Sequence, residues 1–342
     1  MTLTKMMAAA LTVGSMTAHA ADADFCVTTT SELRAALAAA SDGGANQDDR
    51  VFIAVAAGTY LTSDGSARFF YRNSSTTSAL QMWGGYNADC SQKSDDASLS
   101  ILDGANATQV LVASTTDGFL DILSLTIQNA NTNQPGAGID INDTNDDTTG
   151  EVHLRDLIIR NNRTSNSYAG FRAFTRGNHP LYFDNNLVVD NGANNYVGEL
   201  YGEGQVYVRY NTVSNNTAPN ASPGGVFCYG TPTCEIANSV FWMNSNSDLY
   251  LFGDAKMYFD DVGNLTGVVP STNANPIAGD PLFVDPATGD YHLGNGSPLL
   301  AVSTYLDSDS DNDIEGHALP FTGTTDVGAH IDTIFNDKFE SP

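Results

Sequence analysis

Two arginines with polar neighbours at matching positions are the residues of this sequence best suited to bind a ligand. When the repeated segments described below are overlaid without gaps, Arg155, Asn185 and Arg209 fall in one column, and His153 and Tyr207 fall two positions earlier. Arginine binds carboxylates and tyrosine packs on sugar rings. These five residues therefore predict a row of groups on one outer face that could hold an acidic polysaccharide.

A structural role for the same residues is the competing interpretation. Arg155 could pair with Asp156 or Glu151, and the tyrosine could simply cover strand surface. Against this, six of the ten arginines lie between Arg155 and Arg209, in a chain of 40 acidic and 14 basic residues. Both interpretations remain open at this point.

One acidic run has carboxylates at alternate positions, as in a calcium-binding loop. Its members are Asp307, Asp309, Asp311 and Asp313. An EF-hand loop that starts at the first of these needs glycine at its sixth position and glutamate at its twelfth, where the sequence has Asn312 and Ala318. The run is therefore either a looser calcium site or a solvated acidic loop.

The elements that must position these residues follow a repeat. Five segments share the pattern apolar-x-apolar-x-Asn, with gaps of 32, 30, 24 and 29 residues between their final asparagines. A period of this length, with one short strand per repeat, is typical of a solenoid. The asparagines that end the segments are Asn129, Asn161, Asn191, Asn215 and Asn244.

The ungapped overlay predicts two inward-facing rows of apolar side chains. One row comprises Leu125, Leu157, Leu187 and Val240, and the other comprises Ile127, Ile159, Val189, Val213 and Trp242. Side chains of a strand alternate between its two faces, so columns two positions apart face the same way. Asparagine tolerates left-handed backbone geometry, so we expect the final asparagines to form stacked corners rather than a ligand site.

The two ends of the chain differ from its middle. Residues 1–20 read as a cleaved export signal, with one lysine, an apolar stretch and a small-x-small end. A capping box at Thr29 and Glu32 predicts a helix over 31–40 that covers the first coil. We expect a solenoid with its N-terminal cap over 21–269, a closing segment over 270–331 and a tail over 332–342.

Cysteines and net charge limit the compartment and the partners. The spacing of the four cysteines suggests the pairs Cys26 with Cys90 and Cys228 with Cys234, as in an oxidising compartment. A formal charge of −26 argues against nucleic acid and anionic membranes as partners. Without a membrane-spanning segment in the mature chain, we expect an exported monomer.

Several short motifs resemble one group of bacterial proteins. GTY at 58–60, GGYN at 84–87 and LDG at 102–104, with the strand-Asn repeat, resemble the pectate-lyase-like right-handed parallel β-helix proteins. The stretches 280–303 and 326–330 resemble the end of secreted β-helix proteins of the choice-of-anchor Q group, with Val327 and His330 departing from it. The ending at 334–340 resembles a C-terminal motif of exported proteins of gammaproteobacteria. The resemblance implies this fold and export, but no reaction.

No complete catalytic set accompanies this resemblance. Polygalacturonase-type enzymes carry N-T-D, D-D, G-H-G and R-I-K, of which only Asp260-Asp261 occurs here. Glu199 and Glu203 could act as acid and base, or could be solvated surface residues.

We therefore predict an all-β, right-handed parallel β-helix solenoid with a short N-terminal capping helix. Its expected role is that of an exported, surface-associated protein that binds or organises polysaccharide, with calcium as an open question. The alternatives are an enzyme, a polysaccharide lyase before a hydrolase, and a structural adhesin-like stalk.

Overall fold

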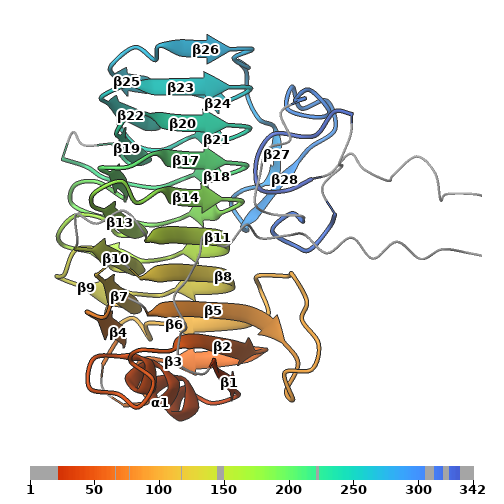
Figure 1. Ribbon diagram of the computed structural model, residues 1–342. Coiled ribbons are helices and arrows are strands. Elements are labelled where there is room, and N and C mark those ends of the chain that lie inside the picture. Colours follow the sequence, from red (N-terminus) through yellow and green to blue (C-terminus); the bar gives the residue numbers. More distant parts are fainter. Residues whose placement is uncertain are drawn as a thin grey trace, which may run out of the picture.

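The chain winds into a stack of coils whose strands are parallel to those of the next coil (Figure 1). The computed structural model describes residues 22–331 except 66, 77, 117, 145–149, 221–222, 305–311 and 319–322. The expected export signal and tail, and Asp307, Asp309 and Asp311, lie outside the described residues. The fold is an all-β parallel β-helix, as the repeat predicts.

One sheet of 16 strands covers two sides of the coils. On the first side, which we name sheet 1, lie β1 (Ala23–Val27), β2 (Arg50–Ala56), β5 (Ala79–Tyr86), β8 (Phe119–Gln128), β11 (Glu151–Arg160), β14 (Leu181–Asp184), β17 (Val206–Arg209), β20 (Cys234–Ala237), β23 (Ala255–Tyr258) and β26 (Thr272–Ala274). On the second side, sheet 2, lie the ends of β8 and β11 with β3 (Gly58–Leu61), β6 (Ser100–Asp103), β15 (Leu187–Val189), β18 (Thr212–Ser214), β21 (Val240–Trp242) and β24 (Asp261–Val262).

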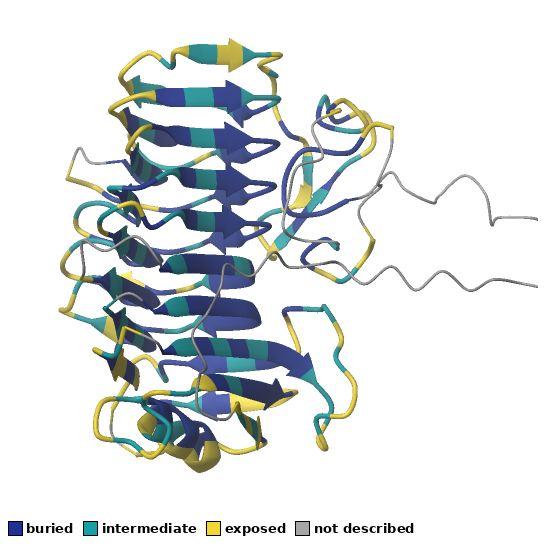
Figure 2. Ribbon diagram, in the orientation of Figure 1, coloured by how far each residue is buried: buried dark blue, intermediate teal, exposed yellow. Residues whose placement is uncertain are grey.

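A separate sheet of eight strands, sheet 3, forms the third side. It contains β4 (Phe69–Asn73), β7 (Leu111–Thr115), β10 (Ile139–Asp143), β13 (Phe171–Thr175), β16 (Gly198–Gly202), β19 (Val226–Gly230), β22 (Leu249–Phe252) and β25 (Leu265–Gly267). Two strand pairs stand apart, namely β9 (Asn131–Thr132) with β12 (Arg163–Thr164), and the antiparallel β27 (Phe283–Asp285) with β28 (Asp290–Leu293). The apolar side chains between the three sheets form one continuous core (Figure 2).

Residues with a left-handed backbone conformation turn the chain at two corners of the regular coils. The corner after sheet 2 has a positive φ at Asn129, Asn161, Asp190, Asn215 and Met243. The corner between sheets 1 and 2 has a positive φ at Ser124, Asp156, Asn185, Tyr210, Asn238 and Phe259. Asparagine is common here because its side chain tolerates this conformation.

A ladder of buried asparagine side chains follows the corner after sheet 2. Each amide group donates to the side-chain oxygen of the next coil at 2.9–3.0 Å, from Asn162 through Asn191 and Asn216 to Asn244. The same oxygens accept the backbone N–H groups of the preceding coil. These bonds satisfy buried backbone groups at the turn, where no strand partner is available.

The observed register corrects the ungapped overlay by one residue in several coils. Ile127 and Ile159 pair in register with Val188, Val213 and Phe241 and face inward. Leu187 and Val240 instead align with Ile158 on the outer surface of sheet 2. The overlay was wrong there because it was anchored on asparagines that alternate between the left-handed corner position and the adjacent ladder position.

The predicted capping helix and both suggested disulfides are present. Helix α1 (Thr30–Ala40) has a capping box between Thr29 and Glu32, and its buried face packs on the first coil. The disulfide Cys26–Cys90 joins β1 to the loop after β5, and Cys228–Cys234 lies in the core of β19 and β20. Both suggested cysteine pairs are therefore confirmed.

Residues after β26 run back along the outside of sheet 2 (Figure 1). Ile158, Leu187 and Val189 pack against Tyr291, Ile314 and Ala329, which form a second apolar cluster outside the coils. The Gly328 N–H donates to the Asn238 carbonyl at 2.8 Å, and the Ala329 N–H donates to Thr212 Oγ1 at 3.0 Å. The described parts of this C-terminal segment (276–331) therefore cover the apolar outer row of sheet 2, a surface that would otherwise be exposed to water.

Candidate functional site

The predicted ligand-binding residues lie on sheet 1 and its corner, but in a different register. Arg155 aligns with Asp184 and then with Arg209, so Asn185 does not belong to the arginine column, contrary to our expectation. Asn185 is 1% exposed at the corner, where its amide donates to Asp156 Oδ1 at 2.7 Å and to the Asn312 carbonyl at 2.9 Å. Its observed contacts therefore join a coil to the C-terminal segment.

Arg155 forms an ion pair that the sequence did not suggest. Its guanidinium donates to both carboxylate oxygens of Asp121, one coil earlier, at 2.9 and 3.0 Å. The side chain of Asp121 is buried, and Arg155 is largely covered. The pair holds two coils together, and it reduces the freedom of Arg155 to bind a ligand carboxylate.

His153 and Tyr207 belong to a ring stack on sheet 1. Tyr182 lies between them, with centroids 4.3 Å from His153 and 5.0 Å from Tyr207 and interplanar angles of 15° and 13°. The guanidinium of Arg209 lies 4.4 Å from the Tyr207 ring centroid, and Arg209 is 4% exposed. Rings stacked in parallel cover one another's faces, so this surface offers a ligand mainly ring edges.

Of the predicted metal ligands, only Asp313 lies among the described residues. It is 1% exposed, and its carboxylate accepts the N–H groups of Glu315, His317 and Ile331 at 2.7–3.2 Å. These bonds anchor a turn. A calcium site over 307–313 remains a prediction.

Sheet 3 carries a row of aromatic side chains that the sequence analysis missed. Phe174, Tyr201, Tyr229 and Phe252 align in register on four neighbouring strands, β13, β16, β19 and β22. Successive ring centroids are 4.9, 4.6 and 5.6 Å apart, and the interplanar angle grows from 17° to 32° and 41°. The first three rings are partly exposed and Phe252 is 53% exposed, so this aromatic row faces solvent.

Charged residues occupy the neighbouring outward row of sheet 3. Arg172 donates to both oxygens of Asp140 at 2.8 and 3.1 Å, and Tyr168 donates to Glu199 at 2.9 Å. Burial raises the pKa of Glu199, and it raises the pKa of Asp140 although Arg172 opposes this. Both carboxyl groups thus have a raised pKa, and Glu199 lies beside the aromatic row.

The sequence held a signal for the aromatic row. The segments FRAFT, GELYG, VFCYG and LYLF each have an aromatic residue at the fourth position. The overlay used the asparagine corners, so it aligned the strands of sheets 1 and 2 and left those of sheet 3 unaligned.

A cleft of about 810 Å³ lies between sheet 2 and the C-terminal segment. Ile158, Arg160 and Leu187 contribute to one wall, and residues from 287–292, 314–317 and His330 contribute to the other. We name it the C-terminal cleft.

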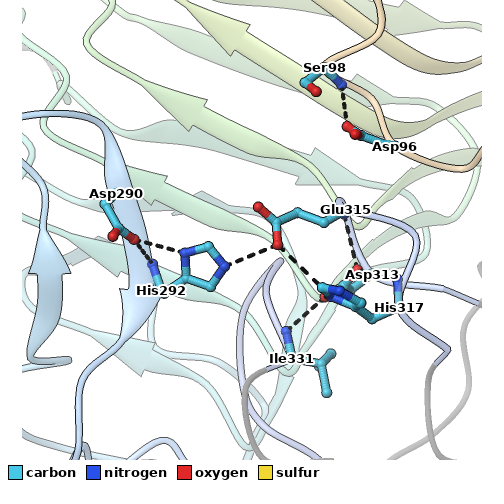
Figure 3. A network of polar contacts seen from close by, with 8 residues as sticks. All are labelled: Asp96, Ser98, Asp290, His292, Asp313, Glu315, His317 and Ile331. Atoms are coloured by element: carbon cyan, nitrogen blue, oxygen red, sulfur yellow. Dashed lines mark hydrogen bonds and ion pairs between the residues drawn. The ribbon is translucent and has the colours of Figure 1, made fainter.

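Polar contacts inside the C-terminal cleft centre on histidines (Figure 3). His292 contacts Asp290 Oδ1 through Nδ1 at 2.7 Å and Glu315 Oε2 through Nε2 at 3.0 Å. The His330 ring lies 4.3 Å from the His292 ring. Burial lowers the pKa of His330 to about 3, and the nearby His292 adds to this effect, so the His330 ring is neutral.

The fold places the protein in the class of parallel β-helix proteins. Its outer faces carry the aromatic row, the charged residues and the C-terminal cleft described above. Residues 92–262 match the family described as right handed beta helix region, and the chain belongs to this family. Comparisons with curated proteins and with solved structures gave no match. No helix among the described residues is long and apolar enough to span a membrane.

Proposed function

We propose that this protein is an exported, surface-associated β-helix protein that binds polysaccharide. The export-type N-terminus, both disulfides and the motifs resembling the choice-of-anchor Q group support this proposal. The aromatic row of sheet 3 is the observation that carries the binding part of it.

The aromatic row suits an extended ligand that runs along the solenoid axis. Neighbouring strands are about 4.8 Å apart, so such a ligand meets one aromatic ring in every coil. The tilts of 32° and 41° after Tyr201 mean that the rings do not fully cover one another's faces. Exposed apolar rings next to hydroxyl groups and charges are well suited to sugars, which have both apolar faces and hydroxyl edges.

Arg155, Arg209, Tyr207, His153 and Asn185 form the second candidate surface for the same role. Arg209, His153 and Asn185 are each at most 8% exposed, so they offer a ligand less area than the aromatic row does. We therefore rank sheet 3 first.

An enzyme acting on the bound chain is the alternative function, and Glu199 is the observation that favours it. A carboxyl group with a raised pKa is suited to act as a general acid. Asp140 aligns with Arg172 and then with Glu199, so both carboxyl groups lie on this face, two coils apart.

The test is retention of the full-length chain on a panel of acidic and neutral polysaccharides, with and without calcium. We expect the double variant Tyr201→Ala/Tyr229→Ala to bind about tenfold more weakly. The matched variant Tyr182→Ala/Tyr207→Ala, which shortens the stack on sheet 1, should bind like the wild type. Weaker binding of Tyr182→Ala/Tyr207→Ala alone would place the binding surface on sheet 1. If the wild type itself is not retained on any polysaccharide, the adhesin-like stalk is favoured.

A parallel assay separates binding from catalysis. Ultraviolet absorbance of unsaturated uronates reports a lyase, and new reducing ends report either enzyme class. A product signal that Glu199→Gln abolishes, with retention unchanged, would establish the enzyme.

A further inference from the structure

Two histidines and a glutamate in the C-terminal cleft have no part in the proposed carbohydrate binding. The ligand-type atoms of His292, Glu315 and His330 all lie within 4.8 Å of one another. From this geometry we propose that the three residues bind one Zn²⁺ ion. The proposal is independent of polysaccharide binding, which we place on another side of the coils.

His330 supplies a second, separate observation. It is 6% exposed, and neither of its ring nitrogens has a hydrogen-bond partner among the residues that the structure describes. A buried imidazole normally bonds to a partner through at least one nitrogen. An ion in the cluster would give His330 the partner that it lacks.

His292 is held in the orientation that a metal ligand needs. Asp290 Oδ1 contacts its Nδ1 at 2.7 Å, which leaves Nε2 directed at Glu315 (Figure 3). Histidine ligands usually bond to a carboxylate or carbonyl through the nitrogen that does not bind the metal. Ion binding would replace the 3.0 Å contact between Nε2 and Glu315 Oε2 by one bond from each group to the ion.

The set of ligand atoms favours zinc over calcium. Two imidazole nitrogens and one carboxylate match a three-residue zinc site that keeps one position for water or a small ligand. Calcium is instead held by oxygen ligands alone. The C-terminal cleft, of about 810 Å³, gives the fourth position its access to solvent.

The three residues come from separate stretches of the C-terminal segment. His292 lies in β28, Glu315 lies in the turn anchored by Asp313, and His330 follows the 326–329 stretch that docks on sheet 2. One ion would therefore tie together stretches that strand pairing alone does not join. We expect zinc to slow hydrogen exchange over 312–331.

Zinc titration of the full-length chain, purified without a polyhistidine tag and treated with a chelator, tests the site. Calorimetry should show one equivalent bound, and Co²⁺ in place of zinc should give visible absorption of a four-coordinate site. His330→Ala and Glu315→Gln should each weaken binding at least about tenfold. Glu315 is exposed at the cleft, so its variant keeps the test valid if the His330 variant unfolds.

His317→Ala is the matched control, because His317 lies in the same cleft but its Nδ1 is bonded to Asp313 at 3.1 Å and lies farther, at 3.9 Å, from Glu315 Oε2. We expect its zinc affinity to equal that of the wild type. Absence of stoichiometric binding, or wild-type affinity in Glu315→Gln with its fold intact by circular dichroism, would overturn the proposal. An equal loss in His317→Ala would overturn the assignment to these three residues.

Discussion

At the scale of single residues, asparagine has two different structural roles at adjacent positions. Asn161 is exposed at the left-handed corner, with a φ of 55°, whereas Asn162 is buried in the ladder. The corner needs only a residue that tolerates positive φ. The ladder needs an amide, which accepts and donates at once.

Substitution of Asn191 tests this distinction. Its side chain is fully buried and bonds to Asn162, to Asn216 and to the carbonyls of Ile159 and Val189. We expect Asn191→Ala to lower the free energy of unfolding by about 3 kcal/mol, because several buried groups lose their partners. Asn161→Gly should change it little, as urea denaturation of both variants would show. Equal losses of unfolding free energy in the two variants would show that the ladder hydrogen bonds do not stabilise the fold more than the corner residue does.

Asp261 makes the stability of the fold depend on pH. Burial, with the charges of Asp248 and Asp280, raises its pKa from 3.8 to about 7. Neither carboxylate oxygen has a hydrogen-bond partner among the described residues. A raised folded-state pKa means that the folded protein holds the proton more tightly, so its contribution to stability is lost as pH rises through about 7.

We therefore expect Asp261→Asn to become more stable than the wild type as the pH is raised. The difference should grow by roughly 1 kcal/mol per pH unit between about pH 4 and pH 7 and then level off. Denaturant unfolding at several pH values measures it, with the exposed Asp254→Asn as the control. A difference that is constant with pH would show that Asp261 ionises normally in the folded protein.

At the scale of elements, the outer row of sheet 2 explains the path of the C-terminal segment. Ile158, Leu187 and Val240 face outward, and the segment covers them with Tyr291, Leu293 and Val327. Gly328 packs against sheet 2, where its N–H bonds to the Asn238 carbonyl, and it has a φ of 113°. A Cβ atom there would lie 2.7 Å from Thr212 Oγ1.

Gly328→Val should loosen this docking. The new side chain would collide with sheet 2 and weaken the bond from the Gly328 N–H to Asn238. We expect limited proteolysis to cut the C-terminal segment faster while the coils stay intact. Gly323→Val is the matched control, because Gly323 also has a positive φ, of 101°, but no atom of the described part of the chain lies within 4 Å of its Cβ position. Equal cleavage of the two variants would assign the effect to backbone strain.

At the scale of the whole molecule, the first coil of the solenoid is capped by a helix, whereas the last strand is left with an unpaired edge among the described residues. Helix α1 covers the first coil, and the disulfide Cys26–Cys90 ties β1 to the loop after β5. The last strand, β26, has no strand beyond it in the described sheet and is partly exposed (Figure 2). Open edges invite pairing between copies, and a net charge of −26 opposes such association. A monomer therefore remains our prediction.

The sequence by itself determined the fold and the capping helix, and its cysteine spacing suggested both disulfide pairs. These features depend on local patterns, namely a repeat of 24 to 32 residues, a capping box and cysteine spacing. Stacking of similar coils turns such a pattern directly into tertiary structure, because each coil contacts mainly its neighbours.

Only the tertiary structure decided the register and the candidate sites. Strand side chains alternate with a period of two. Aligning the ladder residue Asn191 with the corner residue Asn161, one position out of register, therefore placed Leu187 in the core, whereas it lies on the outer face of sheet 2. The aromatic row depends on the alignment of four strands, and the cluster of His292, Glu315 and His330 depends on how an irregular segment packs on sheet 2. The aromatic row left a repeated signal that an overlay on the asparagine corners could not use. The histidine and glutamate cluster left none, because each of its residues is placed by the packing of distant parts of the chain.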